Sequence, residues 1–257
     1  MYLDGILAQH REVASRDSRS LSGLIEATRT ISNSRGFAKR LTEDSKNALA
    51  VIAEIKRRSP SRGLLSHDLE PKVIAEQYKH AGASCISVLT DFDFFGGSAD
   101  DLKSARGAVD LPVLRKDFTV SLNDICDAKL MNADCILLIA AALNKVELAE
   151  FHNFALELGL DVLVESHDEP ELDLALEVGA KMIGVNQRNL RTFEVDQQRA
   201  VRIAKKIPGS VVRVAESGVR TRDDALQLRD AGYHAVLVGE TLVTSENIAM
   251  TLNELRV

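Results

Sequence analysis

The stretch Ala48-Leu-Ala-Val-Ile-Ala-Glu-Ile-Lys-Arg-Arg-Ser-Pro-Ser-Arg-Gly63 joins an apolar run to a polar turn. Its first six residues are typical of a buried strand, and Ser59-Pro60 and Gly63 are typical of a turn. Glu54 and Lys56 are two residues apart, so on a strand their side chains point to the same side. This pair indicates either a functional site at the end of a strand or an exposed, charged strand end, and the neighbouring arginines fit the second interpretation.

The same kind of apolar run recurs along the chain and alternates with longer segments of helical periodicity. The predicted strands span residues 50–55, 85–89, 113–114, 135–139, 162–164, 182–185, 211–214 and 235–238. The predicted helices span residues 71–80, 99–108, 122–131, 145–158, 169–178, 197–207, 222–231 and 245–252. Strands that are apolar throughout are expected in a parallel sheet covered by helices.

Eight strand–helix units predict an α/β fold, a closed (β/α)8 TIM barrel. An open doubly wound sheet is the alternative, but no strand is followed by the glycine pattern of a dinucleotide-binding version. Segments 3–15, 21–31 and 34–46 read as amphipathic helices. We therefore expect one domain over residues 1–257, with residues 1–47 as its N-terminal helical extension. Nothing in this extension indicates catalysis.

Composition excludes several classes of protein. The 257 residues are 45% hydrophobic and 27% charged, which is ordinary for a globular chain with a large core. The net charge of −6 argues against a general nucleic-acid binder, although it allows a local positive pocket for an anion.

The three cysteines, Cys85, Cys126 and Cys135, match no zinc pattern, so we expect buried free thiols. Residues 1–20 lack the apolar stretch of a signal peptide, and the longest apolar run, 135–143, is too short to cross a membrane. These features predict a cytoplasmic protein with no nucleic-acid or membrane partner.

Polar side chains gather at the C-terminal ends of the predicted strands, which is where the chemistry of a (β/α)8 barrel takes place. They are Glu54, Lys56, Lys116, Glu165, Asn186, Arg188 and Glu216. Each residue also has a purely structural explanation. Lys116 could be a snorkelling lysine, Glu165 a charge at a helix N-terminus and Arg188 a surface residue. Because they fall at one register in five strands, together they predict an active site at one mouth of the barrel.

The last two strands predict a phosphate site. They end in Ser217-Gly218 and Gly239, and Ser245 or Asn247 is expected to begin a short helix nearby. Glycines after these strands let backbone N–H groups reach a phosphate, although two ordinary turns are the alternative. The carboxylate of Glu240 would repel a phosphate, so we expect this side chain to point away.

The chain closely resembles the indole-3-glycerol phosphate synthase family of tryptophan biosynthesis. The matching stretches are residues 53–63, 87–90 with 94–98, 112–118, 137–139, 163–165, 183–190 and 214–218. The chain departs from the family pattern at Ser166-His167, Gln187 and Glu240-Thr241, and none of these departures removes a charged catalytic residue. One barrel without a fused isomerase implies the monofunctional form.

The resemblance implies a carboxy-lyase that needs no cofactor and no metal. Such enzymes convert 1-(2-carboxyphenylamino)-1-deoxyribulose 5-phosphate into indole-3-glycerol phosphate, carbon dioxide and water. The resemblance makes Lys116 the acid at the ketone and Glu165 the general base or acid in dehydration. Lys56 and Arg188 would hold the carboxylate of the substrate, and Lys56 would also be placed for proton transfer.

The resemblance also implies the remaining site residues. Glu54 and Asn186 would orient the reacting groups, and Glu54 and Glu216 would keep the lysines placed and charged. The residues expected to contact the rest of the substrate are Phe95, Phe118, Leu137 and Ser217, and those expected to bind phosphate are Ser59, Gly218, Gly239 and Glu240. The loop over residues 57–70 has the composition of a lid.

The expected partner is a small phosphosugar, and the expected state is a monomer or weak homodimer. Two other functions stay open. A lysine Schiff-base aldolase would use Lys116 covalently, and borohydride trapping of the substrate on this residue would identify it. A non-catalytic phosphate-binding barrel would tolerate loss of the charged residues at the strand ends.

Overall fold

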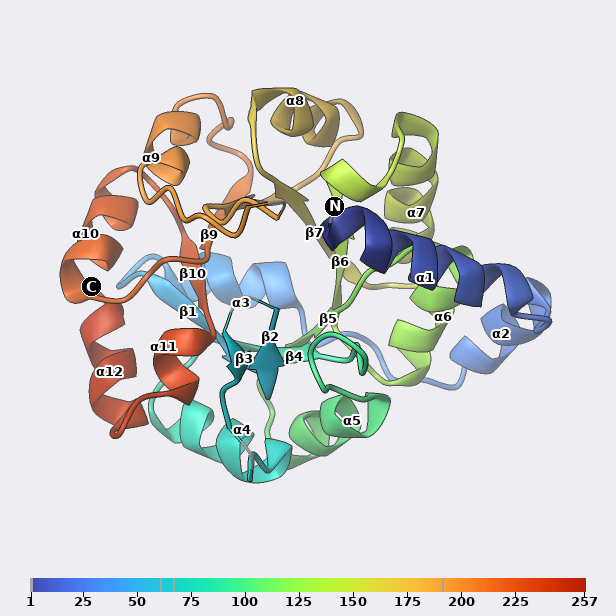
Figure 1. Ribbon diagram of the computed structural model, residues 1–257, viewed down its shortest axis with the longest axis horizontal. Coiled ribbons are helices and arrows are strands. Elements are labelled where there is room, and N and C mark those ends of the chain that lie inside the picture. Colours follow the sequence, from blue (N-terminus) through green and yellow to red (C-terminus); the bar gives the residue numbers. More distant parts are fainter. Residues whose placement is uncertain (1, 61, 67, 191) are drawn as a thin grey trace.

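The computed structural model describes residues 2–60, 62–66, 68–190 and 192–257, and within them eight parallel strands close into a barrel. The strands are β1 (Ala50–Ile55), β4 (Cys85–Leu89), β5 (Val113–Lys116), β6 (Cys135–Ile139), β7 (Asp161–Ser166), β8 (Met182–Asn186), β9 (Val212–Glu216) and β10 (Ala235–Val238). They follow one another in chain order, and β10 pairs with β1 to close the ring. The view in Figure 1 looks into this ring, with the helices outside it. The predicted (β/α)8 barrel is confirmed.

The strands differ from the prediction mainly at their C-terminal ends. β5, β7, β8 and β9 run one or two residues further than the apolar runs alone indicated. The added residues include Lys116, Glu165, Asn186 and Glu216. These polar side chains therefore stand on hydrogen-bonded strands rather than on loops, which fixes their direction.

The outer helices are α4 (Pro71–His80), α5 (Ala99–Ala108), α6 (Leu122–Leu130), α7 (Lys145–Glu157), α8 (Glu169–Glu177), α9 (Arg199–Ala204), α10 (Arg222–Asp230) and α12 (Ile248–Leu255). Many begin at a capping side chain; the Ser121 and Thr221 side chains, for example, accept hydrogen bonds from backbone N–H groups of the first turn. The short helix after β10 is α11 (Glu240–Val243), with Gly239 at its N-cap. The prediction that Ser245 or Asn247 begins a short helix is confirmed for Asn247, whose side chain caps α12, while α11 is an additional helix that the sequence did not indicate.

Shorter elements follow β1 and β6. A two-stranded hairpin, β2 (Arg58–Ser59) with β3 (Gly63–Leu64), follows β1, and the 3-10 helix η1 (Ala140–Ala142) follows β6.

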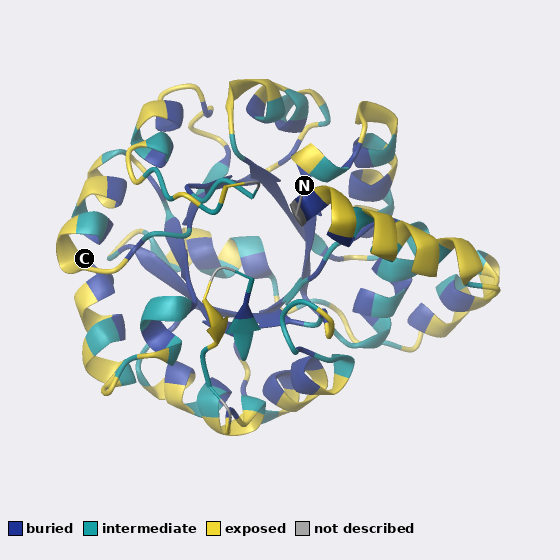
Figure 2. Ribbon diagram, viewed as in Figure 1, coloured by how far each residue is buried: buried dark blue, intermediate teal, exposed yellow. Residues whose placement is uncertain are grey.

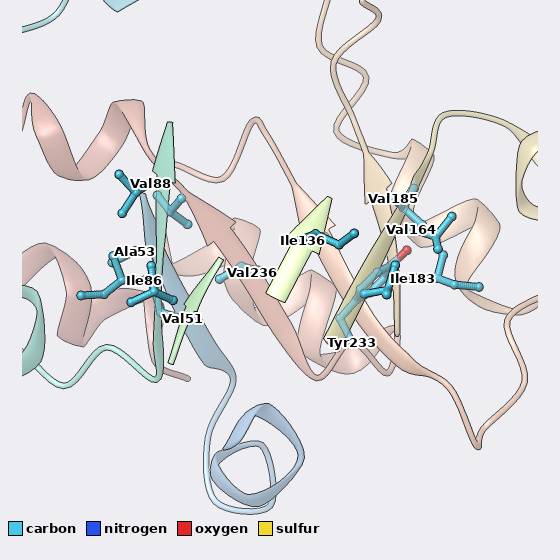
Figure 3. Close-up of a cluster of buried hydrophobic side chains, with 14 of the residues drawn as sticks. Val51, Ala53, Ile86, Val88, Ile136, Val164, Ile183, Val185, Tyr233 and Val236 are labelled. Atoms are coloured by element: carbon cyan, nitrogen blue, oxygen red, sulfur yellow. The ribbon is translucent and has the colours of Figure 1, made fainter. Parts of the chain in front are cut away.

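The strands separate two apolar cores. On β1, Val51 and Ala53 face the outer helices, whereas Ala50 and Ile52 face the barrel interior. Figure 3 shows part of the outer core, including Val51, Ala53 and Ile86. Figure 2 shows the buried strands and the exposed outer faces of the helices. Because residues alternate between the two cores, Glu54 and Lys56 continue the interior row that begins with Ala50 and Ile52.

The N-terminal extension packs on both ends of the barrel. Its helices are α1 (Tyr2–Arg16), α2 (Leu21–Thr28) and α3 (Phe37–Asp44). Phe37 and Leu41 of α3 are fully buried against the interior residues at the starts of the strands. α2 packs on α6, and α1 crosses the opposite end, where Arg11 binds Glu147 with two hydrogen bonds of 2.8 and 3.1 Å (Figure 1).

The three cysteines are buried free thiols, as predicted. No helix among the described residues has the length and apolar character needed to span a bilayer.

Candidate active site

One cavity opens at the C-terminal ends of the strands, and all fifteen predicted site residues line it. They are Glu54, Lys56, Ser59, Phe95, Lys116, Phe118, Leu137, Glu165, Asn186, Arg188, Glu216, Ser217, Gly218, Gly239 and Glu240. The barrel therefore brings together side chains that are up to about 190 residues apart in the sequence, from Glu54 to Glu240. Their roles remain predictions.

The centre of the cavity holds two lysines among three carboxylates. Lys116 Nζ lies 3.6 Å from Glu165 Oε2 and 3.6 Å from Glu216 Oε2. Lys56 Nζ lies 2.6 Å from Glu54 Oε1, as expected for neighbours on one side of a strand. The three carboxylates are almost completely buried, so the charges act on one another with little screening by water.

These contacts keep Lys116 and Glu165 charged. Burial alone would lower the pKa of Lys116, but Glu165, Glu216 and Glu54 raise it above its ordinary value. Burial alone would raise the pKa of Glu165, but Lys116 and then His167 hold it well below its ordinary value. The pKa of Glu54 is lowered in the same way, against the effect of burial, by Lys56 and Lys116.

Glu216 behaves differently from the other two carboxyl groups. Burial and the nearby charge of Glu165 raise its pKa, and Lys116 offsets these effects only in part. Neither of its carboxyl oxygens has a hydrogen-bond partner among the described residues. Because one lysine cannot stabilise two buried carboxylates equally, Glu216 is the member of the pair that retains a proton.

Two glycines make room for this cluster. A Cβ atom on Gly184 of β8 would overlap Oε1 of Glu216, and a Cβ atom on Gly239 would overlap Oε1 of Glu54. Both positions belong to interior rows, where larger side chains would otherwise fill the barrel. The carboxylates reach the centre of the cavity because these positions carry no side chain.

Asn186 and Arg188 line the same side of the cavity. The Asn186 side-chain oxygen accepts a hydrogen bond of 2.9 Å from the Arg188 backbone N–H, and Arg188 Nη1 donates to the Phe193 carbonyl at 3.1 Å. The carboxylate of Glu240 lies 3.8 Å from Arg188 and 3.0 Å from Arg62. The expectation that the Glu240 side chain points away from the phosphate site needs correction, because this carboxylate pairs with Arg188, an arginine of the cavity lining.

The turn after β9 has an uncommon backbone conformation. Ser217 and Gly218 have φ values of 65° and 76°, and an L-residue with a side chain rarely adopts such values. The carbonyls of these two residues accept 2.8 Å hydrogen bonds from the side chains of Gln187 and Gln197, respectively. With Gly239 at the start of α11, this turn gives backbone N–H groups near the cavity, as an anion site requires.

The apolar wall of the cavity combines side chains that the sequence predicted, Phe95 and Phe118, with two that it did not indicate. The ring centroids of Phe95 and Phe118 are 6.3 Å apart. Leu3 and Ile6 of α1 also line the cavity, so the N-terminal extension contributes to the site. Their spacing of three residues on a helix is compatible with one apolar face, but the sequence alone does not show what that face covers.

His10, Asp91 and Asp117 lie close enough together to hold a metal ion, and they are the only such group among the described residues. Most of their polar atoms already have protein partners. His10 Nε2 lies 2.9 Å from Asp91 Oδ2, and Asp91 Oδ1 accepts from two backbone N–H groups at 2.7 and 3.1 Å. Arg115 Nη2 donates to Asp117 Oδ2 at 2.9 Å. The group is therefore explained as a hydrogen-bonded attachment of α1 to the barrel mouth.

The loop predicted to form a lid contains the β2–β3 hairpin. Arg57 anchors its start by binding Asp101, with one hydrogen bond of 2.9 Å, and the Leu69 carbonyl at 3.2 Å. Ser61 and His67 of this loop lie outside the described residues. Closure of the loop remains a prediction.

Comparison with known proteins identifies a family. Residues 3–255 match the family model described as indole-3-glycerol phosphate synthase. A protein of that name from Chlorobium luteolum is 48% identical over 250 residues, covering 96% of this chain and 95% of the relative. One from Chloroherpeton thalassium is 46% identical over 251 residues, covering 96% of both chains.

Solved structures of lower identity share the fold alone. A thiamine phosphate pyrophosphorylase from Pyrococcus furiosus has a TM-score of 0.60 at 16% identity, covering 80% of this chain and 93% of that one. An N-acetylmannosamine-6-phosphate 2-epimerase from Clostridium perfringens has a TM-score of 0.60 at 13% identity, covering 75% of this chain and 86% of that one.

Proposed function

The chain belongs to the indole-3-glycerol phosphate synthase family and has its function in tryptophan biosynthesis, and we propose how its residues carry out the reaction. The substrate is 1-(2-carboxyphenylamino)-1-deoxyribulose 5-phosphate, and the class is a carbon–carbon lyase of the carboxy-lyase type. The observation that carries the proposal is Lys116, a half-buried cation held 3.6 Å from two carboxyl groups in the cavity.

Ring closure needs an acid at the ketone. As the ring carbon attacks, negative charge develops on the ketone oxygen, and a positioned ammonium group stabilises and protonates it. Lys116 is charged and points into the cavity, which supports this role. Lys56 and Arg188 offer the positive charge that would hold the substrate carboxylate until carbon dioxide leaves.

Dehydration needs a group that removes a proton and a group that supplies one to the departing hydroxyl. Glu165 is ionised and is assigned the proton removal, and Lys56, which lines the same cavity, is assigned the proton that leaves with the hydroxyl as water. Glu54 keeps Lys56 in place through the 2.6 Å contact, and Asn186 orients the Arg188 backbone. Since Glu216 tends to retain a proton, Glu165 is the carboxylate that chiefly keeps Lys116 charged. Glu216 mainly holds the Lys116 side chain in place.

The two ends of the substrate fit the two sides of the cavity. The aromatic ring is placed against Phe95, Phe118 and Leu137, and Ser217 contacts the substrate near the turn after β9. The phosphate is placed at Gly218, Gly239, Ser59 and the backbone of residue 240. Arg62 and Arg188 neutralise the Glu240 carboxylate in this arrangement, which removes the repulsion of a phosphate.

The partner is this phosphosugar alone, and no cofactor or metal takes part in the proposed steps. Exposed large apolar side chains are spread over α1, β3, α4, α7, α12 and the loop after β4 among the described residues, which supports a monomer or weak homodimer. Three buried thiols support a reducing, cytoplasmic setting.

Indole formation tests the proposal directly. The purified protein is mixed with the carboxyphenylamino substrate in buffer containing a chelator, and indole fluorescence is followed. We expect saturable production of indole-3-glycerol phosphate with release of one carbon dioxide per turnover. No product, or borohydride trapping of substrate on Lys116, would overturn the acid–base proposal in favour of a binding protein or a Schiff-base enzyme.

A further inference from the structure

His167 lies directly after β7, behind the proposed base. Its Nε2 atom is 3.2 Å from Glu165 Oε1, and its Nδ1 atom is 2.9 Å from Glu171 Oε2. The side chain is 11% exposed, and the residue does not line the cavity. The ring therefore separates two carboxylates, one in the active site and one at the start of α8.

The number of protons on the ring follows from these contacts. Glu171 Oε2 also accepts the His167 backbone N–H at 2.8 Å, which identifies this oxygen as an acceptor. A neutral imidazole has one N–H and one lone pair, so one of its nitrogens would face a carboxylate oxygen without a proton between them. The doubly protonated imidazolium removes this conflict, because Nδ1–H donates to Glu171 while Nε2 brings positive charge to an ion-pair distance of 3.2 Å from Glu165, without the geometry of a hydrogen bond.

The electrostatics agree with this geometry. Burial alone would lower the pKa of His167, but Glu165 and Glu171 raise it to about 10. The described charged and polar groups that act on Glu165 are Lys116 from β5, Glu216 from β9, Glu54 from β1, Asn186 from β8 and His167 itself. His167 is thus the cation behind Glu165, whereas Lys116 is the cation on its cavity side.

We propose that His167 is a positioning residue that remains an imidazolium in the working enzyme and holds Glu165 in its ionised form. Glu165 Oε1 faces His167, and Oε2 faces Lys116 and the cavity. The imidazolium leaves one oxygen free for substrate and prevents burial from protonating the base. This inference rests on the proposed function in one respect, the role of Glu165 as the base.

The first experiment measures the protonation state without activity. Nitrogen-15 spectra of the ring nitrogens are recorded near pH 8, where an ordinary histidine with a pKa of about 6.5 is neutral. His167→Gln assigns the signal by its disappearance. We expect an imidazolium for His167 and a neutral ring for the buried His152, whose pKa is lowered by burial. A neutral His167 ring under these conditions would overturn the inference.

The second experiment separates positioning from structure. In His167→Gln, Glu165 loses a neighbouring cation, so its pKa should rise and the acid limb of the kcat profile should move to higher pH. At about pH 5, kcat should therefore fall by about 10-fold or more. Near pH 8 kcat should stay within about 3-fold, and KM should change little. His152→Gln is the matched control, since it removes a buried histidine outside the cavity.

Glu171→Gln provides a second variant in case His167→Gln does not fold. It should lower the pKa of the His167 ring, which the same nitrogen-15 titration detects, and move the acid limb in the same direction. An equal loss of kcat at every pH, or an unchanged acid limb in an active variant, overturns the inference but not the proposed function. Absence of product from the unaltered protein overturns the proposed function, and the nitrogen-15 spectra still decide the charge on His167.

Discussion

Glu165 Oε2 lies 3.6 Å from Lys116 Nζ, although β6 stands between their strands in the barrel wall. The contact therefore crosses the barrel interior rather than running along the sheet. Glu165 is buried and Lys116 is half-buried, and each stabilises the charged form of the other. If Lys116 is the proposed acid and Glu165 the proposed base, this contact places both for proton transfer before substrate arrives.

Removing either member of this pair should reduce turnover while the barrel stays folded. Lys116→Ala and Glu165→Gln are each expected to lower kcat by about 100-fold or more, as for loss of a positioned acid or base. Steady-state indole fluorescence measures the effect. Lys145→Ala is the control, since its side chain is 67% exposed and pairs with Glu177 on the surface. Near-normal turnover in both site variants would refute the assignment.

Glu216→Gln should change how stability depends on pH. The folded protein keeps the Glu216 proton from the ordinary pKa of 4.5 up to about 8, whereas the unfolded chain releases it. More protons bound in the folded state means that the free energy of unfolding falls as pH rises through this window. Glutamine does not titrate, so the variant should gain several kcal/mol relative to the parent across the window, since each pKa unit corresponds to about 1.4 kcal/mol.

Urea unfolding at a series of pH values measures this difference for Glu216→Gln. Glu177→Gln, which removes an exposed surface carboxylate, is the control and should run parallel to the parent. A Glu216→Gln curve that also runs parallel to the parent would show that Glu216 is ionised in the folded protein.

Gly239→Ala tests the space reserved for the carboxylates. The added methyl group would meet Glu54 Oε1 and lie 3.1 Å from Lys56 Nζ, so both side chains must move. A shift of about 1 Å in a catalytic group costs about 100-fold, and we expect at least a 10-fold loss of kcat/KM. Gly209→Ala is the matched control, because no atom lies within 4 Å of the added carbon. Equal activity of the two variants would contradict this account of Gly239.

His10→Gln should loosen the attachment of α1 in a pH-dependent way. Burial alone would lower the pKa of His10, but the hydrogen bond to Asp91 and the charge of Asp117 raise it. For a raised histidine pKa, the stabilisation is complete below the ordinary value of 6.5 and is lost as pH rises through the folded value. The variant should therefore lose about 1 kcal/mol at mildly acidic pH and less at alkaline pH.

Thermal or urea unfolding at the two pH values measures this effect. His80→Gln is a suitable control, because that exposed ring forms its hydrogen bond of 2.7 Å with the Glu76 carbonyl of its own helix. If the loss in His10→Gln were the same at both pH values, the charge of His10 would not be its cause.

Phe37→Ala tests the closure of the barrel at the end opposite the cavity. The ring is fully buried among interior residues, and truncation should lower the free energy of unfolding by about 3–5 kcal/mol. Because the site lies at the other end, kcat of the folded fraction should be retained. Lys39→Ala on the same helix, 78% exposed, should change stability little. A small effect of Phe37→Ala would show that α3 is not part of the core.

Local patterns were sufficient to predict the barrel. Apolar runs such as 50–55 and 135–139 coincide with β1 and β6, because a strand covered on both faces must be apolar along its length. The prediction ended too early at β5, β7, β8 and β9, because polar residues at the strand ends interrupt the apolar pattern. The same interruptions were the signal that indicated the site.

The sequence by itself determined the (β/α)8 class, the family and the residues around the cavity, since these depend on short-range patterns and on the fixed place of strand ends in a barrel. Only the tertiary structure decided which charges meet: Lys116 with Glu165, His167 behind that carboxylate, and Glu240 with Arg62 and Arg188. It also decided that α1 lies against the cavity. These contacts join residues that are distant in the chain, and the protonation of each group depends on burial and on all its neighbours together. For this reason Glu54-Ile-Lys56, ambiguous as a sequence, becomes part of the proposed active site when the barrel closes around it.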